Sequence, residues 1–211
     1  MLTLALILIP LLATAIIFFG VSVNARKIAL GAAALNIAVA IAAIFTSGFS
    51  DFTLNVLSKP NINLALDIHQ NGGISVVLLL LSVIVTLAAV LSGTCPKGRE
   101  KLWYCSALLI SAGAIGAFIS TDLFFFFAFH ELALIPTFLM IGILGRGDRK
   151  EVAWKVTVYL AFGSIVLLAG LLMIAPQLGS FDMTQLTALS HHQNEIALLL
   201  IIGFGTLVSL F

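Results

Sequence analysis

Long apolar stretches alternate with short polar breaks along the 211-residue chain. A helix that crosses the hydrocarbon core of a bilayer needs about 20 predominantly apolar residues, and most of these stretches reach that length. The pattern therefore predicts about seven transmembrane helices, over residues 2–21, 28–47, 74–92, 102–119, 122–144, 156–175 and 196–211. No composition shift marks a second domain, so residues 1–211 are expected to form one transmembrane domain.

Composition indicates the class of protein, and the charges of the loops indicate its orientation in the membrane. Hydrophobic residues make up 61% of the chain and charged residues only 9%, which excludes a soluble domain and predicts an all-α membrane protein. Of the 10 Lys and Arg residues, all but Lys59 follow the first, third or fifth stretch. Because basic loops stay in the cytoplasm, we expect the N-terminus outside and a multi-pass protein of the cell inner (plasma) membrane.

The charge count depends on a break at Ser120-Thr-Asp122. Without it, residues 102–144 would form a helix of 43 residues, which no bilayer accommodates. The longest polar segment, residues 47–71, is the one substantial extramembrane loop in this prediction. The last stretch reaches Phe211 without a polar or basic end, so we expect the chain to be a fragment truncated at its C-terminus.

Glu131 is the acid that lies deepest in a predicted span. It follows Asp122 by nine residues, or roughly 13–14 Å along a helix, close to the middle of a hydrocarbon core about 30 Å thick. An ionisable group there costs on the order of 3 kcal/mol, so it usually belongs to a proton or ion path. The alternative is a protonated Glu131 that hydrogen-bonds a neighbouring helix and only helps packing.

Three neighbouring residues have two interpretations each. Pro136 removes one helical hydrogen bond, which produces either a kink that admits water beside Glu131 or a merely tolerated kink. His130 is either a secondary proton relay or a buried neutral side chain. Lys155, which opens the sixth predicted span, is either the charge partner of Glu131 or an ordinary snorkelling lysine.

Other chemistry has little support in the sequence. The two cysteines form no metal-binding or disulfide pattern, and His191-His192 lacks further ligands at a useful spacing. Small residues in the spans allow close contact between helices: Ser106, Ser111, Gly113, Gly116, Gly163 and Gly170. We expect no cofactor, no metal and no nucleic-acid partner for this chain.

Residues 120–145, STDLFFFFAFHELALIPTFLMIGILG, resemble the fifth-span signature of the antiporter-like, proton-translocating membrane subunits of NADH-quinone oxidoreductase (respiratory complex I), chain M in particular. Gly73-Ile-Ser75, the Lys155…Tyr159…Gly163 pattern and residues 203–211 are similar to further parts of this family. Multisubunit Na⁺/H⁺ antiporters and membrane-bound hydrogenases share the pattern.

The resemblance implies the N-terminal half of an inverted-repeat fold, with Glu131 as the glutamate of a proton half-channel. It places Leu207 where the family has a lysine that pairs with this glutamate. It also implies that other membrane subunits are partners and that NADH, FMN, iron–sulfur clusters and quinone belong to partner subunits. The rival functions are a cation/proton antiporter or hydrogenase subunit of the same superfamily, and a non-transporting membrane scaffold.

Overall fold

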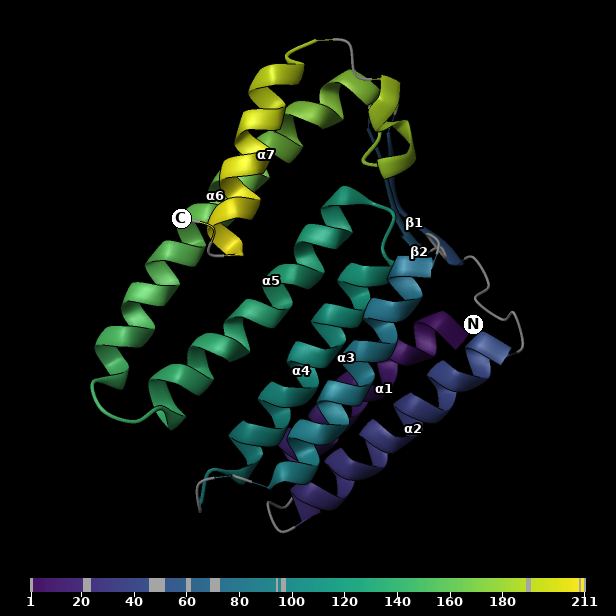
Figure 1. The fold of residues 1–211 in the computed structure, drawn as a ribbon. Helices are drawn as coiled ribbons and strands as arrows, with labels where there is room; N and C mark the ends of the chain where they lie inside the picture. Colours follow the sequence, from purple (N-terminus) through teal and green to yellow (C-terminus); the bar gives the residue numbers. More distant parts are fainter. Residues whose placement is uncertain are drawn as a thin grey trace.

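The computed structural model describes residues 2–20, 24–45, 73–93, 95, 98–188, 191–208 and 210, together with the backbone of 52–59 and 62–68. In these ranges the chain forms a bundle of long, roughly antiparallel helices with a small β-hairpin at one end (Figure 1). The predicted span ends at 21, 47 and 211 lie outside the described residues. The predicted helical membrane fold is confirmed, with a hairpin added between the second and third long helices.

In the part of the chain that the structure describes, six helices are long and apolar enough to cross a membrane, and a seventh is apolar but shorter. Their bounds follow the hydrophobic pattern: α1 Leu2–Phe19, α2 Ala25–Phe45, α3 Gly73–Ser92, α4 Glu100–Ile119, α5 Leu123–Leu139, α6 Arg149–Leu178 and α7 Gln193–Leu207. A π-helical segment, η2 (Met140–Leu144), continues α5, and a 3-10 segment, η3 (Met183–Ala188), lies between α6 and α7. The break predicted at 120–122 separates α4 from α5.

The hairpin is absent from the sequence-based prediction, which gives residues 47–71 as an extramembrane loop. Strands β1 (Phe52–Lys59) and β2 (Ile62–Ile68) pair antiparallel, with a register shift between Asn55 and Leu57. Alternation of apolar and polar residues in both segments was the available signal. Both strands of a two-stranded hairpin have an unpaired edge whose backbone groups need water, so such a segment suits a position outside the hydrocarbon.

The buried core among the described residues falls into two regions. Two clusters fill the inside of α1–α4, around residues such as Leu6, Leu79 and Leu108. A third joins α6 and α7 through Leu167 and its neighbours. Helix α5 contributes only Leu123 to these fully buried clusters, so most of its length lies between the two regions rather than inside either.

Glycines bring two pairs of helices into close contact. A Cβ added to Gly116 of α4 would lie 2.4 Å from the Phe129 ring of α5, and one added to Gly203 of α7 would lie 2.8 Å from Leu167 of α6. Both distances are shorter than any ordinary contact, so the helices could not approach this closely with a larger residue. The pairs α4–α5 and α6–α7 are therefore tightly packed units.

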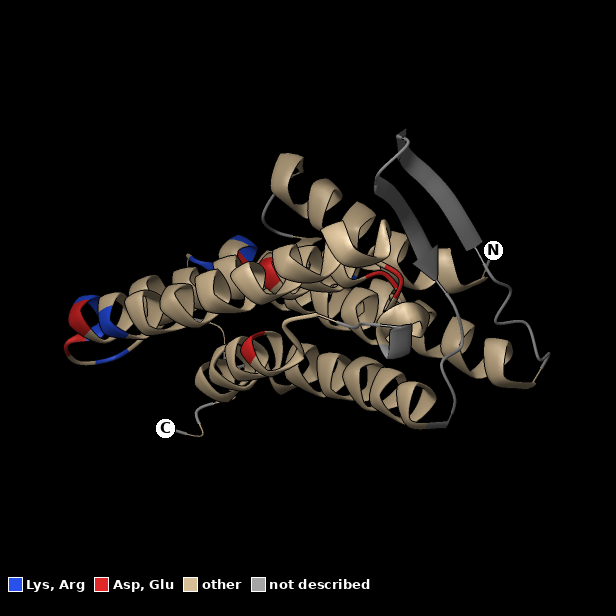
Figure 2. Ribbon diagram, turned by 90° about the horizontal axis from the view of Figure 1, so that it is seen from above, with Lys and Arg blue, Asp and Glu red and all other residues tan. Residues whose placement is uncertain are grey.

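Basic side chains bind the carboxyl ends of α1 and α3. Lys101 Nζ donates to the Gly20 carbonyl after α1, and Arg26 Nη2 donates to the Leu91 carbonyl of α3 at 3.4 Å. Lys and Arg residues gather toward this end of the molecule (Figure 2). A cation at a helix C-terminus satisfies free carbonyls and is favoured by the helix dipole. The basic residues that predict orientation thus also join neighbouring helices.

Candidate functional site

The first turn of α5 is fixed by a buried acid. Asp122 is 4% exposed, and its Oδ1 accepts hydrogen bonds from the Phe124 and Phe125 amides at 2.9 and 3.0 Å. This is an N-cap, in which a side-chain oxygen satisfies amides that have no partner in the helix. The Leu123 amide also donates to the Phe181 carbonyl at 2.8 Å. The start of α5 is thereby attached to the segment that follows α6.

The contact between α4 and α5 determines which face of α5 carries Glu131. Phe129 lies against Gly116, and Ala133 lies within 3.0 Å of where a Cβ on Gly113 would be. Phe129 and Ala133 share one face of α5 because they are four residues apart. Glu131 lies two residues from each, at about 100° per residue, and so occupies the opposite face. That face is directed toward α6.

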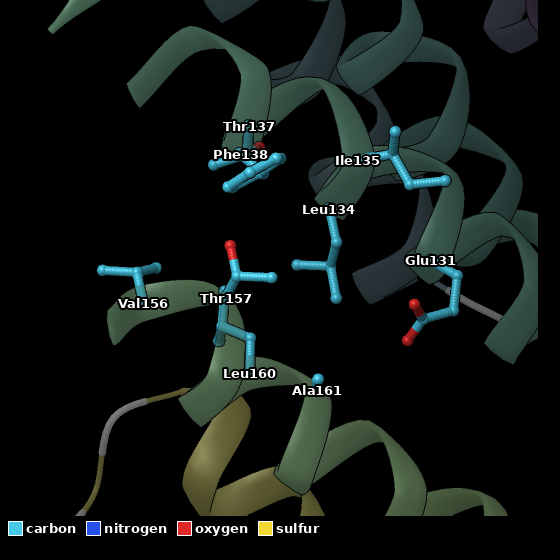
Figure 3. Close-up of a pocket in the computed structure, with 9 residues that line it drawn as sticks. All are labelled: Glu131, Leu134, Ile135, Thr137, Phe138, Val156, Thr157, Leu160 and Ala161. Atoms are coloured by element: carbon cyan, nitrogen blue, oxygen red, sulfur yellow. The ribbon is translucent and has the colours of Figure 1, made fainter. Parts of the chain in front are cut away.

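Glu131 lines a cavity between α5 and α6 (Figure 3). The cavity has a volume of about 170 Å³, and Figure 3 shows the Glu131 carboxylate at one end of it. Its other walls are Leu134, Ile135, Thr137 and Phe138 of α5, and Val156, Thr157, Leu160 and Ala161 of α6. One water molecule needs only about 10–15 Å³ of such space, so several would fit beside the carboxylate.

The Glu131 carboxyl group has an unsatisfied atom. Its Oε1 is buried and has no hydrogen-bond partner in the described part of the chain, and the same holds for Nδ1 of His130. An unsatisfied buried polar atom is costly, which favours water as the missing partner at Glu131. His130 is half-buried and does not line the cavity, so the structure does not bring the two side chains together there.

Two threonines missed by the sequence analysis complete the cavity wall. The Thr137 hydroxyl donates to the Ala133 carbonyl and the Thr157 hydroxyl to the Ala153 carbonyl, at 2.8 and 2.7 Å. Each hydroxyl oxygen keeps lone pairs that can accept a hydrogen bond from water. Their relation to Glu131 depends on how α5 faces α6, which the sequence pattern does not reveal.

Lys155 is directed to another acid. Its Nζ lies 2.6 Å from Glu151 Oε1, one turn earlier in α6, and both side chains are largely exposed. Helix α6 begins at Arg149, so the lysine lies in its second turn, and the expectation that Lys155 opens the membrane-spanning part of this helix stays a prediction. The helix extends past the apolar stretch since the Glu151–Lys155 pair suits a helix outside the hydrocarbon. Its role as partner of Glu131 stays a prediction.

Pro136 lies within α5, and irregular backbone comes after it. The helix continues to Leu139 and then widens into η2, whose Ile143 carbonyl accepts hydrogen bonds from both Arg99 and Arg149, at 3.2 and 3.0 Å. Proline interrupts the helical ladder, and π-helical turns often accompany functional sites. The two arginines hold the end of the Glu131 helix to the first turns of α4 and α6.

Leu207, which the resemblance aligns with a lysine of the family, lies among apolar side chains in the structure. Leu207 is the last residue of α7 and packs against the α6–α7 core. Its neighbour Thr206 is buried, with its hydroxyl bonded to the Ile202 carbonyl at 2.7 Å. Within the described residues, Glu131 therefore forms no salt bridge from this direction or from Lys155.

The fold defines a polytopic helical membrane protein with a carboxyl group inside one span, beside a cavity that can hold water. Residues 120–211 match the family described as NADH:quinone oxidoreductase/Mrp antiporter, TM. Through this segment the chain is similar to antiporter-like membrane subunits of quinone oxidoreductases.

Curated relatives and solved structures agree with this similarity. NAD(P)H-quinone oxidoreductase chain 4 of the Chlorokybus atmophyticus chloroplast is 40% identical over 134 residues, which are 63% of this chain and 26% of the relative. Chain 4 of Prochlorococcus marinus (strain AS9601) is 33% identical over 172 residues, 76% of this chain and 32% of the relative. The matches thus span about a third or less of the curated relatives.

The solved structures share the fold at low sequence identity. A chain of respiratory complex I from Thermus thermophilus gives a TM-score of 0.78 at 22% identity, covering 98% of this chain and 43% of the other. A chain of the membrane-bound sulfane sulfur reductase, an archaeal respiratory membrane complex, gives a TM-score of 0.77 at 21% identity, covering 95% and 33%. Nearly the whole length of this chain therefore adopts one shared arrangement of helices.

Proposed function

We propose that this chain is part of a proton-translocating membrane subunit of an NADH-quinone oxidoreductase-type complex, corresponding to chain M, also called chain 4. The observation that carries the proposal is the buried, unpartnered Oε1 of Glu131 beside a cavity that can hold water. A carboxyl group so placed accepts a proton from water on one side and releases it when its surroundings change.

The packing around Glu131 supports movement of this kind. Helices α4 and α5 form one tightly packed pair and α6 and α7 another, with the cavity between α5 and α6. A small shift of α5 relative to α6 at the cavity, between the attachments at the two ends of α5, would change the hydration of Glu131. Changed hydration alters the free energy of the charged carboxylate, and thus its proton affinity.

In the assembled complex this subunit would couple electron transfer in partner subunits to proton movement through Glu131. NADH, FMN, iron–sulfur clusters and quinone would be bound by those partners, and this chain would bind other membrane subunits and lipid. The positive-inside distribution supports a location in the plasma membrane of the cell, with the N-terminus outside.

The test is proton pumping by the assembled complex with Glu131→Gln. Glutamine keeps the size of the side chain but exchanges no proton, so we expect pumping to be abolished or sharply reduced. Glu151→Gln is the matched control, because Glu151 is an exposed acid bonded to Lys155 and away from the cavity. Full pumping with Gln at position 131 would refute the proposal.

The same superfamily contains antiporter subunits, as the matching family description states. The requirement for an electron donor distinguishes this second function from the first. An NADH-quinone oxidoreductase subunit supports proton movement that requires quinone-linked electron transfer, whereas an antiporter subunit exchanges Na⁺ for protons without it. Measuring both activities in the same vesicles distinguishes the two functions.

A further inference from the structure

A second cavity lies at the basic end of α5 and α6, and Phe138 is the one residue that it shares with the lining of the cavity beside Glu131. Its volume is about 300 Å³. Leu139, Gly142 and Ile143 form one wall, while Ala153 and Trp154 form the other, with Lys150 at its edge. The cavity thus runs from the charged connection between the two helices toward the apolar part of α5.

Cations are in excess around this cavity. Arg146 and Lys150 are exposed, and neither has an ion-pair partner in the described part of the chain. Arg149 is held over the same wall by its bond to the Ile143 carbonyl. Of the acids in the connection, Glu151 is already bonded to Lys155, which leaves Asp148. A negatively charged group is therefore favoured here.

Trp154 places the cavity at the level of the membrane interface. It is 67% exposed although it is a large aromatic residue. Tryptophan is enriched where lipid headgroups meet the hydrocarbon, because its ring is apolar and its N–H is polar. Leu139 lies five residues before Leu144, so the cavity reaches about 7–8 Å from the end of η2 into the span.

We propose that this cavity binds an anionic phospholipid. One acyl chain would lie between α5 and α6, and the phosphate would be bound by Lys150 with Arg146 or Arg149, the residues suited to phosphate geometry and charge. Basic pockets between transmembrane helices on the cytoplasmic side are suited to anionic headgroups. An acidic peptide fits less well, because it would bring unsatisfied backbone groups into the hydrocarbon.

The test uses Trp154 as the reporter. The full-length protein is reconstituted in phosphatidylcholine vesicles that contain increasing amounts of phosphatidylglycerol, with bromine on the acyl chains of one lipid or the other. Bromine quenches a tryptophan that it contacts. The contribution of Trp154 is the quenching that disappears in Trp154→Phe. We expect brominated phosphatidylglycerol to quench Trp154 at lower mole fractions than brominated phosphatidylcholine.

Matched variants identify the headgroup site. Lys150→Gln should weaken the preference for phosphatidylglycerol about fivefold, the value expected for one basic residue near an anionic headgroup. Lys27→Gln removes the same charge from the same end of the molecule but away from the cavity, and should leave the preference unchanged. Equal quenching by both lipids, or an equal effect of the two variants, would overturn the proposal. Absence of Trp154 quenching by either lipid would overturn it too, because protein would then cover the cavity.

Discussion

Asp122 and Asp182 face each other across an isolated antiparallel bridge that joins the α4–α5 turn to the segment after α6. Each carboxylate also caps the turn on its C-terminal side: Asp182 Oδ1 accepts from the Thr184 amide at 2.8 Å, much as Asp122 caps α5. The bridge connects the helix that carries Glu131 to the α6–α7 pair at one end, while Arg99 and Arg149 hold the other end. Glu131 lies between these two attachments.

Removal of the Asp122 cap should destabilise the protein. Asp122→Ala leaves the first amides of α5 without an acceptor, at a cost of about 1 kcal/mol and up to roughly 2 kcal/mol. Asp122→Asn keeps an oxygen in the same place and is an equally good cap, so it should cost much less. Thermal unfolding in detergent compares the two variants. Equal losses for Ala and Asn would show that the cap does not stabilise α5.

The close contact between Phe129 and Gly116 of α4 should not tolerate a methyl group added to the glycine. Gly116→Ala places a Cβ 2.4 Å from the Phe129 ring, and we expect a loss of about 1–3 kcal/mol, as for other overpacked sites. Gly31→Ala in α2 is the control, because nothing lies within 4 Å of its added Cβ. The control should gain stability from helix propensity. A stable Gly116→Ala variant with unchanged proton pumping would contradict the close contact between Gly116 and Phe129.

Cys95 should report the orientation of the chain. It lies in the basic connection between α3 and α4, whereas Cys105 is buried and serves as an internal control. A membrane-impermeant maleimide should label Cys95 only from the cytoplasmic side. Burial, with a smaller effect of the Glu100 charge, raises the pKa of the Cys95 thiol. Less thiolate is therefore present at neutral pH, and labelling should keep accelerating above the usual cysteine range near pH 8.5.

Labelling from the outside alone would reverse the predicted topology. Cys95→Ser provides the background in both vesicle orientations. A labelling rate that levels off below pH 8.5 would contradict the raised pKa.

Lys155→Gln should leave proton pumping largely intact. Its ammonium group is bonded to Glu151, so its removal frees an exposed acid rather than changing the charge beside Glu131. Exposed pairs of this kind contribute only about 0.3–0.5 kcal/mol to stability. Pumping is compared with that of Glu131→Gln in the same assembled complex. An equally severe defect in both variants would identify Lys155 as the charge partner of Glu131.

Much of the architecture follows from residues that can be recognised in the sequence. Ser120-Thr-Asp122 was predicted as a break from loop charge and span length, and the structure gives Asp122 a capping role there. Glu131 was singled out because an acid deep in a span is costly. Gly113 and Gly116 were expected to permit close helix contact, which they do against α5.

The features that were missed depend on contacts between distant segments. Thr157 faces Glu131 across the cavity only because α5 turns one side to α4 and the other to α6. The start of α6 at Arg149 was missed because polar residues outside the hydrocarbon carry no apolar signal. Arg99 and Arg149 are 50 residues apart in sequence, yet both bond the Ile143 carbonyl, which lies between them in the chain.

The most direct measurement of the central claim is the protonation of Glu131 during turnover. Infrared difference spectra of the assembled complex, recorded with and without NADH-driven electron transfer, report carboxyl groups that gain or lose a proton. We predict a carboxyl band that disappears in Glu131→Gln and remains in Glu151→Gln. Difference spectra that are identical in the wild type and in Glu131→Gln would show that the protonation of Glu131 does not change during turnover, and would contradict the account.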